Sequence, residues 1–253
     1  MPLIRNPESN AVGFYSHIPK CAGSSIADAL VYSKRLVYFH RYKQCGERKE
    51  VSKVARIYLK DYYPYDESQG GSQKTFPDEV SPCSIHHWHL ELSKYYFDLS
   101  KCDYKFAVVR DPVERLISEY KFRKGAYCPI SNINTWENYD LGRNCESTFK
   151  TEDFGYWLRI CYEGWLLNPY IWDNHFRPQH EFVEPRFDII PFNVDKINSY
   201  LRETVGTISG IPWVNKSDNM EVNVTQEDRQ LIEEWYNKDY ELFANKKDYN
   251  WIE

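Results

Sequence analysis

The sequence predicts an α/β fold in which helices flank a central parallel sheet. Short apolar runs alternate along the chain with stretches of helical periodicity, the pattern of strands joined by helical crossovers. The run at 104–110 (YKFAVVR) is largely apolar, as in parallel strands that are buried on both faces. Of the 253 residues, 42% are hydrophobic and 27% charged, so we expect a packed core and predict a single domain over residues 1–253.

Local patterns predict the elements of the first half of the chain. The helix at 24–32 places Ile26, Ala29 and Leu30 on one face. The segment 66–82 is polar and rich in Gly and Ser, which is typical of a mobile surface loop. The expected elements are strands at 12–18, 36–40 and 83–89, and helices at 24–32 and 51–62.

The helix that follows the strand at 104–110 carries clear start signals. Asp111 is placed to cap it, Pro112 suits its first position, and Glu114 completes a capping-box pattern. Its core-facing residues follow the helical period: Val113, Leu116, Ile117 and Tyr120. A long polar loop is expected at 128–151, and a late helix at 225–243 with Thr225 as its cap.

Charge and cysteine content narrow the classes of partner. The net charge of −5 argues against a nucleic-acid partner, which usually requires a basic surface. No apolar run reaches the length of a membrane span, and the first residues lack the apolar region of a signal peptide. Seven scattered cysteines without a C-x-x-C pair make a zinc site improbable. We therefore expect a reduced, cytoplasmic protein without membrane or nucleic-acid partners.

The stretch GFYSHIPKCAGSSI at 13–26 predicts a site for a phosphate-type anion. A strand runs into a loop of small residues and then into a helix, whose first N–H groups can bind an anion. The pattern of the nucleoside triphosphatases, G-x-x-x-x-G-K-[ST], is absent, and a capped turn with a surface lysine is the plain structural alternative. The candidate binding residues are Lys20, Cys21, Ala22, Gly23, Ser24 and Ser25.

A second motif, FAVVRDPVERLISEY at 106–120, predicts a second phosphate site. Arg110 ends a buried strand, where open α/β sheets bind ligands, and Ser118 lies on the following helix. An arginine can grip a phosphate with a bidentate fork, so Arg110 and Ser118 are the candidate pair. Asp111 is assigned to capping and Arg115 to a structural ion pair, and an ion pair at the end of the strand is the alternative role of Arg110.

Together the two motifs, P-K-x-x-G-S-S and R-D-P-x-x-R-x-x-S-x-Y, resemble the sulfotransferases that use 3′-phosphoadenosine 5′-phosphosulfate (PAPS). The resemblance is to the carbohydrate type, which includes heparan sulfate 2-O-sulfotransferase. It implies a P-loop-like sulfotransferase fold, with residues 20–25 at the 5′-phosphosulfate, Arg110 and Ser118 at the 3′-phosphate, and no metal. It extends weakly through DNHFRPQ at 173–179 and DYELF at 239–243.

Sulfuryl transfer to a hydroxyl needs a base, and the segment SIHHWHLEL offers three histidines. In a strand, His87 and His89 would share one face and His86 would point away. Heparan sulfate 2-O-sulfotransferase carries an H-x-H pair at a similar place, and by that resemblance His87 and His89 are the candidates, with His89 preferred as base. Other relatives carry a single histidine here. Glu91 is the alternative base. A structural role and metal binding are the remaining alternatives for these histidines, although no carboxylate or cysteine set with ligand spacing accompanies them.

Other histidines are secondary candidates. His17 lies beside the anion loop, and His175 and Arg177 are candidates for lining the acceptor or sulfuryl side. Lys20 is expected to stabilise the leaving oxygen and is the third catalytic candidate.

The expected function is transfer of a sulfuryl group from PAPS to the hydroxyl or amine of a small metabolite or natural product, leaving 3′,5′-diphosphoadenosine (PAP). A carbohydrate O-sulfotransferase is the alternative. Two remoter alternatives are a nucleotide-binding protein without catalysis and a kinase-like P-loop enzyme.

Overall fold

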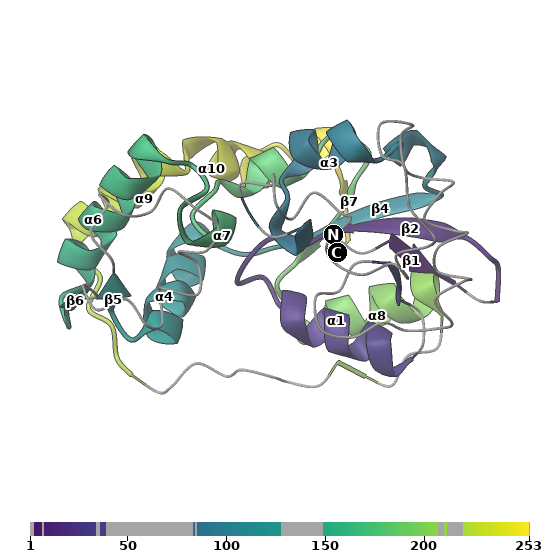
Figure 1. Cartoon of the computed structure of the whole chain (residues 1–253), viewed down its shortest axis with the longest axis horizontal. Helices are drawn as coiled ribbons and strands as arrows, with labels where there is room; N and C mark the ends of the chain where they lie inside the picture. Colours follow the sequence, from purple (N-terminus) through teal and green to yellow (C-terminus); the bar gives the residue numbers. More distant parts are fainter. Residues whose placement is uncertain are drawn as a thin grey trace, which may run out of the picture.

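The computed structural model describes residues 3–6, 8–33, 36–38, 83, 85–127, 149–206, 210–211 and 220–252. These residues form a six-stranded sheet in the order β3-β1-β2-β4-β7-β8 (Figure 1). Strands β2, β4, β7 and β8 run parallel to one another, whereas β1 pairs antiparallel with both β2 and β3. The predicted central, mostly parallel sheet is therefore confirmed. The strands are β1 Leu3–Arg5, β2 Val12–Ser16, β3 Leu36–Tyr38, β4 Tyr104–Val109, β7 Asp188–Pro191 and β8 Asn250–Trp251.

Strands β2 and β4 lie at the centre of the sheet. Their side chains are therefore buried on both faces, except for the first two residues of β4, which are partly buried. In register, Ser16 lies opposite Ala107, and Val109 lies opposite Pro191. The three parallel strands β2, β4 and β7 thus end at one edge of the sheet. Both sequence motifs follow directly from this edge, where open α/β sheets bind their ligands.

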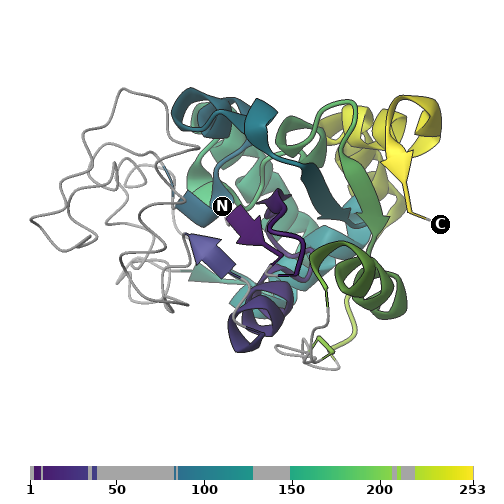
Figure 2. The ribbon, with the colours of Figure 1, turned by 90° about the vertical axis from the view of Figure 1, so that its right-hand side faces the viewer.

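Helices cover both faces of the sheet. Helices α1 (Gly23–Tyr32) and α8 (Val194–Tyr200) lie on one face, and α3 (Leu90–Tyr96) lies on the other (Figures 1 and 2). Their buried apolar side chains pack with those of the strands into one core, which includes Phe14, Phe106 and Ile190.

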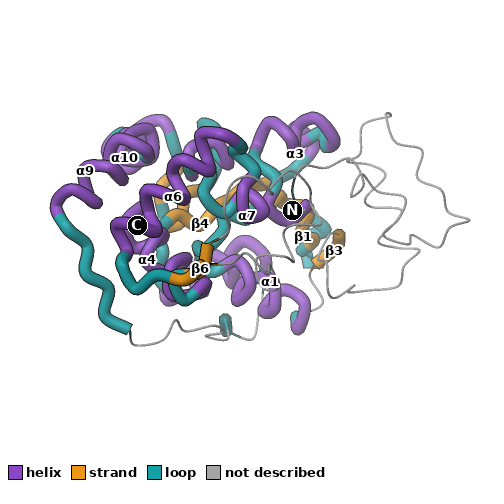
Figure 3. The backbone as a smooth tube through the Cα atoms, turned by 60° about the vertical axis from the view of Figure 1, so that its left-hand side comes forward, coloured by secondary structure: helices purple, strands orange, loops and turns teal. Residues whose placement is uncertain are grey.

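A second hydrophobic core lies between helices at one end of the molecule. Helices α4, α6 and α9 gather there, away from β1 and β3 (Figure 3). Their packing buries large aromatic side chains, including Trp157, Phe176 and Trp235. The helices are α4 Pro112–Arg123, α6 Phe154–Leu167 and α9 Gln226–Trp235, with α10 (Asn237–Ala244) following α9 and a two-stranded sheet of β5 (Ala126–Tyr127) and β6 (Phe149–Lys150) beside them. A single domain over the whole chain stays a prediction.

The predicted start of α4 is confirmed. Asp111 caps the helix by accepting a 3.0 Å hydrogen bond from the Glu114 N–H, and Pro112 opens it. Val113, Leu116 and Tyr120 are buried, as their spacing predicts, and Ile117 is partly buried against the same core.

The predicted strand at 83–89 is wrong. A short 3-10 turn spans Ile85–His87, and α3 begins at Leu90. Burial does not alternate in this segment, because the adjacent residues His87 and Trp88 are both buried, and the buried residues that follow, Leu90, Ser93 and Phe97, have helical spacing. The Ser93 N–H donates to the His89 carbonyl and closes the first helical turn.

Three smaller differences concern element bounds. The late helix at 225–243 is two helices, because Tyr236 leaves the helical region with φ −108° and ψ 27°. Thr225 caps α9 in a reciprocal capping box with Asp228, as predicted. The end of the expected loop 128–151 forms β6, and β1 was not predicted. The predictions at 39–40, 51–62, 66–82 and 128–148 lie outside the described residues. No helix in the part of the chain that the structure describes is long and apolar enough to cross a membrane.

Candidate active site

The loop after β2 has the backbone geometry of an anion nest. Lys20 and Ala22 adopt left-handed conformations, with φ of 67° and 62°, and Cys21 between them does not. Such an alternation turns neighbouring N–H groups toward one concave side. The Ile26 N–H donates to the Ala22 carbonyl at 2.9 Å, so α1 begins immediately after the loop. The N–H groups of its first turn add to the positive end of the nest.

Close packing requires a glycine at position 23 of the loop. A Cβ atom on Gly23 would lie 1.6 Å from Nε2 of His17, because the His17 ring occupies that space. Ser25 is buried and Ser24 is exposed. Cys21 is buried too, and its Sγ lies 3.6 Å from Oε1 of Gln179. Burial raises the pKa of the Cys21 thiol to about 11, so this side chain is neutral at physiological pH.

Lys20 extends from the loop along α4. Its Nζ lies 4.0 Å from the centre of the Phe122 ring, in a cation–π contact. Burial lowers the pKa of Lys20, and the nearby Arg123 and Arg110 lower it further, whereas the charge of Glu119 raises it. The loop therefore carries a partly desolvated cation, which favours an anionic ligand.

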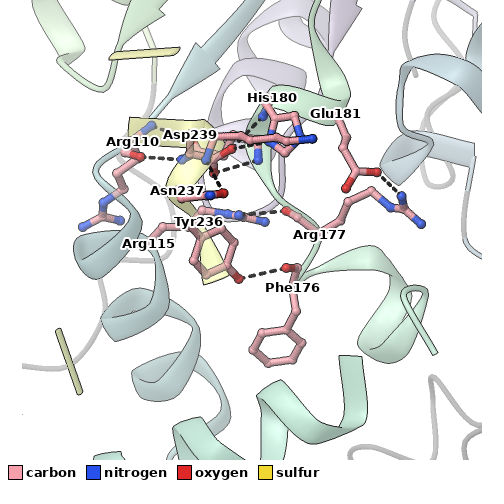
Figure 4. Close-up of polar contacts among 11 residues, drawn as sticks. Arg110, Arg115, Phe176, Arg177, His180, Glu181, Tyr236, Asn237 and Asp239 are labelled. Carbon is pink, nitrogen blue, oxygen red and sulfur yellow. Dashed lines mark hydrogen bonds and ion pairs between the residues drawn. The ribbon is translucent and has the colours of Figure 1, made fainter. Parts of the chain in front are cut away.

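Arg110 leaves the end of β4 with its backbone fixed on both sides. Gln179 accepts from the Arg110 N–H at 2.9 Å and donates to the Arg110 carbonyl at 2.7 Å (Figure 4). The guanidinium lies over the Phe192 ring and 3.4 Å from the Glu114 carboxylate. Ser118 is partly buried on α4, eight residues further along the chain. Their joint grip on a phosphate stays a prediction.

Arg115 is a structural residue, but the predicted ion pair is wrong. Its guanidinium is buried and donates three hydrogen bonds to backbone carbonyls rather than to a carboxylate. These bonds join α4 to the loop after β2 and to the segment after residue 174, and Figure 4 shows the bond to Arg177. The acceptors are the carbonyls of Pro19 at 3.0 Å, Arg177 at 2.9 Å and His175 at 2.7 Å.

Four histidine rings gather beside the loop. His87 lies at the centre, with ring centres 4.0 Å from His86, 4.9 Å from His17 and 4.7 Å from His175. Its Nδ1 is hydrogen-bonded to Oδ2 of Asp173 at 2.7 Å, and both side chains are buried. The prediction that His86 points away from His87 is wrong, because the two residues share a 3-10 turn instead of a strand.

The partner of His87 comes from an unusual turn. Trp172, Asp173 and Asn174 are three consecutive left-handed residues, with φ of 53°, 59° and 68°. Each such non-glycine residue costs about 1–3 kcal/mol, and such strain is common at functional sites. The turn directs two side chains to His87, because Asn174 Nδ2 also donates to the His87 carbonyl at 2.7 Å.

A second histidine–carboxylate pair faces the first. His175 Nδ1 is hydrogen-bonded to Oε2 of Glu119 at 3.0 Å, and Oε1 of the same carboxylate accepts from Nε of Arg123. The His175 ring meets the His87 ring edge to face at 85°. Burial alone would raise the pKa of Glu119, but Arg123, His175 and Lys20 outweigh it and hold the pKa well below its usual value. Glu119 is therefore a buried anion between Lys20 and the histidines.

Comparison with known proteins now gives the family. A family model described as "Sulfotransferase family" matches residues 6–209. The chain belongs to the sulfotransferase family. This match covers both motifs and the four histidines of the cluster around His87, and it agrees with the α/β architecture around the parallel sheet. Searches among curated proteins and among solved structures found no match. The sulfotransferase is thus an enzyme of sulfuryl transfer, and a small molecule or glycan is the general class of acceptor.

The remaining candidates, His89 and Glu91, lie at the start of α3. His89 is half-buried, with its ring 5.8 Å from that of Tyr170. Burial and the charge of Arg177 lower the pKa of His89 to about 4. Its Nδ1 is buried without a hydrogen-bond partner among the described residues. Glu91 is exposed at the start of α3.

Arg177 contacts the histidine cluster through Asn174, whose side chain donates to the His87 carbonyl. Its Nε donates to Oδ1 of Asn174 at 2.6 Å, and its Nη1 pairs with Glu181 (Figure 4). In the same segment, Gln179 and His180 donate their N–H groups to the buried Asp239 carboxylate at 2.8 Å each. The weak motifs at 173–179 and 239–243 therefore contact each other and fix the backbone behind the site.

One group of described residues has metal-ligand chemistry. Ligand-type atoms of His86, His87 and Asp173 lie within 4.8 Å of one another. The hydrogen bond between Nδ1 of His87 and Asp173 already links two of the three. A carboxylate at Nδ1 of a histidine is found both at general bases and at metal-binding histidines, so the absence of a metal stays a prediction.

Sequence reasoning missed three functional candidates. Glu119 is an unspecified position within the second motif, and Asp173 opens the weak motif DNHFRPQ. Arg123 ends α4 and stacks on the Trp172 ring at 3.7 Å. The available signal was the placement of two of them inside motifs, but nothing in the sequence paired them with particular histidines.

Proposed function

We propose that this sulfotransferase transfers the sulfuryl group of PAPS to a hydroxyl group of a small acceptor, with His87 as the general base. One observation carries the proposal: the buried His87–Asp173 pair lies beside the nest of Lys20 and Ala22. His17 connects them, because its ring lies against Gly23 on one side and 4.9 Å from the His87 ring on the other.

In this proposal the donor binds across the edge of the sheet. The 5′-phosphosulfate occupies the loop of residues 20–25, where N–H groups and Lys20 supply positive charge. The 3′-phosphate lies against Arg110 and Ser118. Gln179 supports that reading, because it holds the Arg110 backbone at the end of β4.

The chemistry is an in-line displacement at sulfur. The acceptor oxygen attacks the sulfuryl group and gives its proton to Nε2 of His87, while the bond from sulfur to the bridging oxygen breaks and PAP leaves. Asp173 accepts from Nδ1 of His87 and stabilises the imidazolium as it forms. Lys20 stabilises the negative charge that develops on the bridging oxygen.

The pKa of His87 suits a base that must be neutral before reaction. Burial and the neighbouring His175 lower this pKa well below the usual 6.5, and Glu119 and Asp173 act in the opposite direction. The ring is therefore unprotonated at neutral pH. The acid limb of the rate profile is expected below pH 6.5 for the same reason.

His87 is favoured over His89 on physical grounds. The preference for His89 used its place in a strand, and that strand is replaced by a turn and α3. His87 has a buried carboxylate at Nδ1, and for His89 no such partner exists among the described residues. His89 and Glu91 stay alternatives that one experiment separates.

The test compares four alanine variants, at His87, His89, His86 and Lys20, in a transfer assay with labelled PAPS and chelated metal. His87→Ala should lower kcat by about 10²–10⁴, the range for a lost general base, and should remove the acid limb. PAP affinity, measured by calorimetry, should be retained and shows that the variant is folded. Lys20→Ala should lower kcat more than PAP affinity.

Other outcomes assign the role elsewhere. A large kcat loss in His89→Ala with full activity in His87→Ala would make His89 the base, and activity in all three histidine variants would point to Glu91. Tight PAP binding without transfer to any acceptor would favour the non-catalytic alternative.

The acceptor is proposed to be a neutral or cationic small metabolite. The net charge of −5 supports this, since a polyanionic glycan favours a basic surface. Screening small hydroxyl compounds, amines and oligosaccharides with labelled donor tests it. Transfer confined to oligosaccharides would instead support the carbohydrate O-sulfotransferase.

A further inference from the structure

Among the described residues, Glu119 is a buried carboxylate that is hydrogen-bonded to His175 and whose charge also acts on Lys20. Its side chain is almost fully buried on α4, with an exposed fraction of 2%. One oxygen accepts from Arg123, and the other is hydrogen-bonded to Nδ1 of His175. The α4 residue one turn earlier, Arg115, clamps the anion loop at Pro19, so Glu119 lies on the face of α4 that points to the site.

We propose that Glu119 is a positioning residue that sets the charge of Lys20 and the orientation of His175, and through His175 the environment of His87. The inference rests on the catalytic roles proposed above for Lys20 and His87. Glu119 itself does not touch the reacting atoms.

On the leaving-group side, the charge of Glu119 favours the protonated form of Lys20. Lys20 is partly buried, and two arginines lie close enough to lower its pKa together with burial. Glu119 is the carboxylate that opposes them, and the face of Phe122 supports the ammonium form at 4.0 Å. Lys20 can stabilise an anionic bridging oxygen only as an ammonium ion, and the charge of Glu119 favours that form.

On the base side, Glu119 fixes the His175 ring. The bond from Glu119 to Nδ1 of His175 favours the tautomer that carries the proton on that nitrogen. It also holds the His175 and His87 rings edge to face, with their centres 4.7 Å apart. A carboxylate bound to Nδ1 is the usual device for selecting a histidine tautomer and orientation. The two pairs, Glu119–His175 and Asp173–His87, therefore form one packed unit.

The charged and titratable groups around Glu119 come from several elements. Lys20 belongs to the loop after β2, Arg123 to α4, and His175 to the segment after α7 (Ile171–Asn174). The charge of Glu119 also acts on Cys161 of α6 and on Tyr236, between α9 and α10. The pKa values of both groups are raised, mainly by burial and to a smaller extent by Glu119. Both stay neutral, so Lys20, Arg123 and the histidines are the groups that respond to loss of this charge.

The deciding variants are Glu119→Gln, which removes the charge at nearly constant shape, and Glu119→Asp, which keeps it. Direct titration of Lys20, by NMR of isotope-labelled methylated lysine, should show a lower pKa in Glu119→Gln than in the wild type. Nitrogen NMR should show a changed tautomer balance of His175. The alkaline limb of kcat should move to lower pH, and kcat should fall by about 10- to 100-fold, the size expected for one hydrogen bond to a charged group.

Glu119→Asp should restore the wild-type pKa of Lys20, because it keeps the carboxylate charge. A residue with a purely structural role would not give this rescue. The matched control is Asp228→Asn, which removes another buried carboxylate, at the start of α9. It should lower stability and leave the Lys20 titration unchanged. Both NMR measurements are independent of activity, so they test Glu119 even if Lys20 or His87 has another role. An unchanged Lys20 pKa and an unchanged His175 tautomer in Glu119→Gln would overturn the inference.

Discussion

Removal of the Arg115 side chain should destabilise the whole protein and weaken donor binding together. Arg115 is only 2% exposed, and it donates to the carbonyls of Pro19, His175 and Arg177. Those acceptors belong to the anion loop and to the segment that carries the histidine–carboxylate pairs. Arg115→Met keeps much of the apolar stem but leaves three carbonyls without their donor.

The magnitude follows from the three bonds. Hydrogen bonds to a charged group contribute roughly 1.5–3 kcal/mol each, so three would sum to about 5–9 kcal/mol. The variant also avoids the cost of burying a guanidinium, so the net loss should be nearer ~3–5 kcal/mol, toward the low end of what three unpaired buried carbonyls cost at about 1–3 kcal/mol each. This is a large share of the roughly 5–15 kcal/mol that stabilises a typical protein.

Urea denaturation measures the loss, and PAP calorimetry on the folded fraction measures the effect on the site. Arg115→Lys should give an intermediate loss, because one ammonium group cannot serve three divergent carbonyls. The matched control is Arg159→Met, whose side chain is half exposed and lies 3.7 Å from Glu227. Its effect should stay within about 1 kcal/mol. A loss of that size in Arg115→Met would refute the clamp, and normal stability with weak PAP binding would make Arg115 a ligand residue instead.

Two further predictions concern the nucleotide and the histidines. Arg110→Ala should weaken PAP much more than adenosine 5′-phosphate, which lacks the 3′-phosphate; equal losses by calorimetry would remove Arg110 from that role. Burial lowers the pKa values of His86 and His87 well below 6.5, so below that pH the unfolded chain takes up protons that the folded chain does not. The free energy of unfolding should therefore be highest above pH 6.5 and fall as the pH is lowered, and equal urea midpoints at pH 7.5 and 5.5 would contradict the buried neutral cluster.

The elements that the sequence predicted best are those fixed by local signals. Strand β4 is an apolar run that is buried along most of its length, and α4 combines the Asp111 cap with Pro112 at its start. The loop after β2 could be placed because small residues between a strand and a helix permit few other structures. The left-handed backbone of Lys20, however, carries no sequence signal, since lysine does not favour it.

The predictions failed where the local signal was short or ambiguous. The residues around His86 offered too few positions to distinguish period two from a turn followed by a helix. In the late helix, the break at Tyr236 depends on tertiary contacts, because its hydroxyl donates to the buried Phe176 carbonyl at 2.8 Å (Figure 4). Both features are set by the packing of distant segments rather than by their own sequence.

The histidine–carboxylate pairs show the same limit at the site. Asp173 lies 86 residues from His87, and Glu119 lies 56 residues from His175. The sequence could identify histidines as candidate bases by their chemistry, but the choice among them depends on which ring obtains a buried carboxylate at Nδ1. That choice is made by the strained turn of Trp172, Asp173 and Asn174 and by the face of α4 that carries Glu119. The proposed assignment of the base therefore begins from the carboxylates, because the folded structure distinguishes His87 from His89 by the buried Asp173 at its Nδ1.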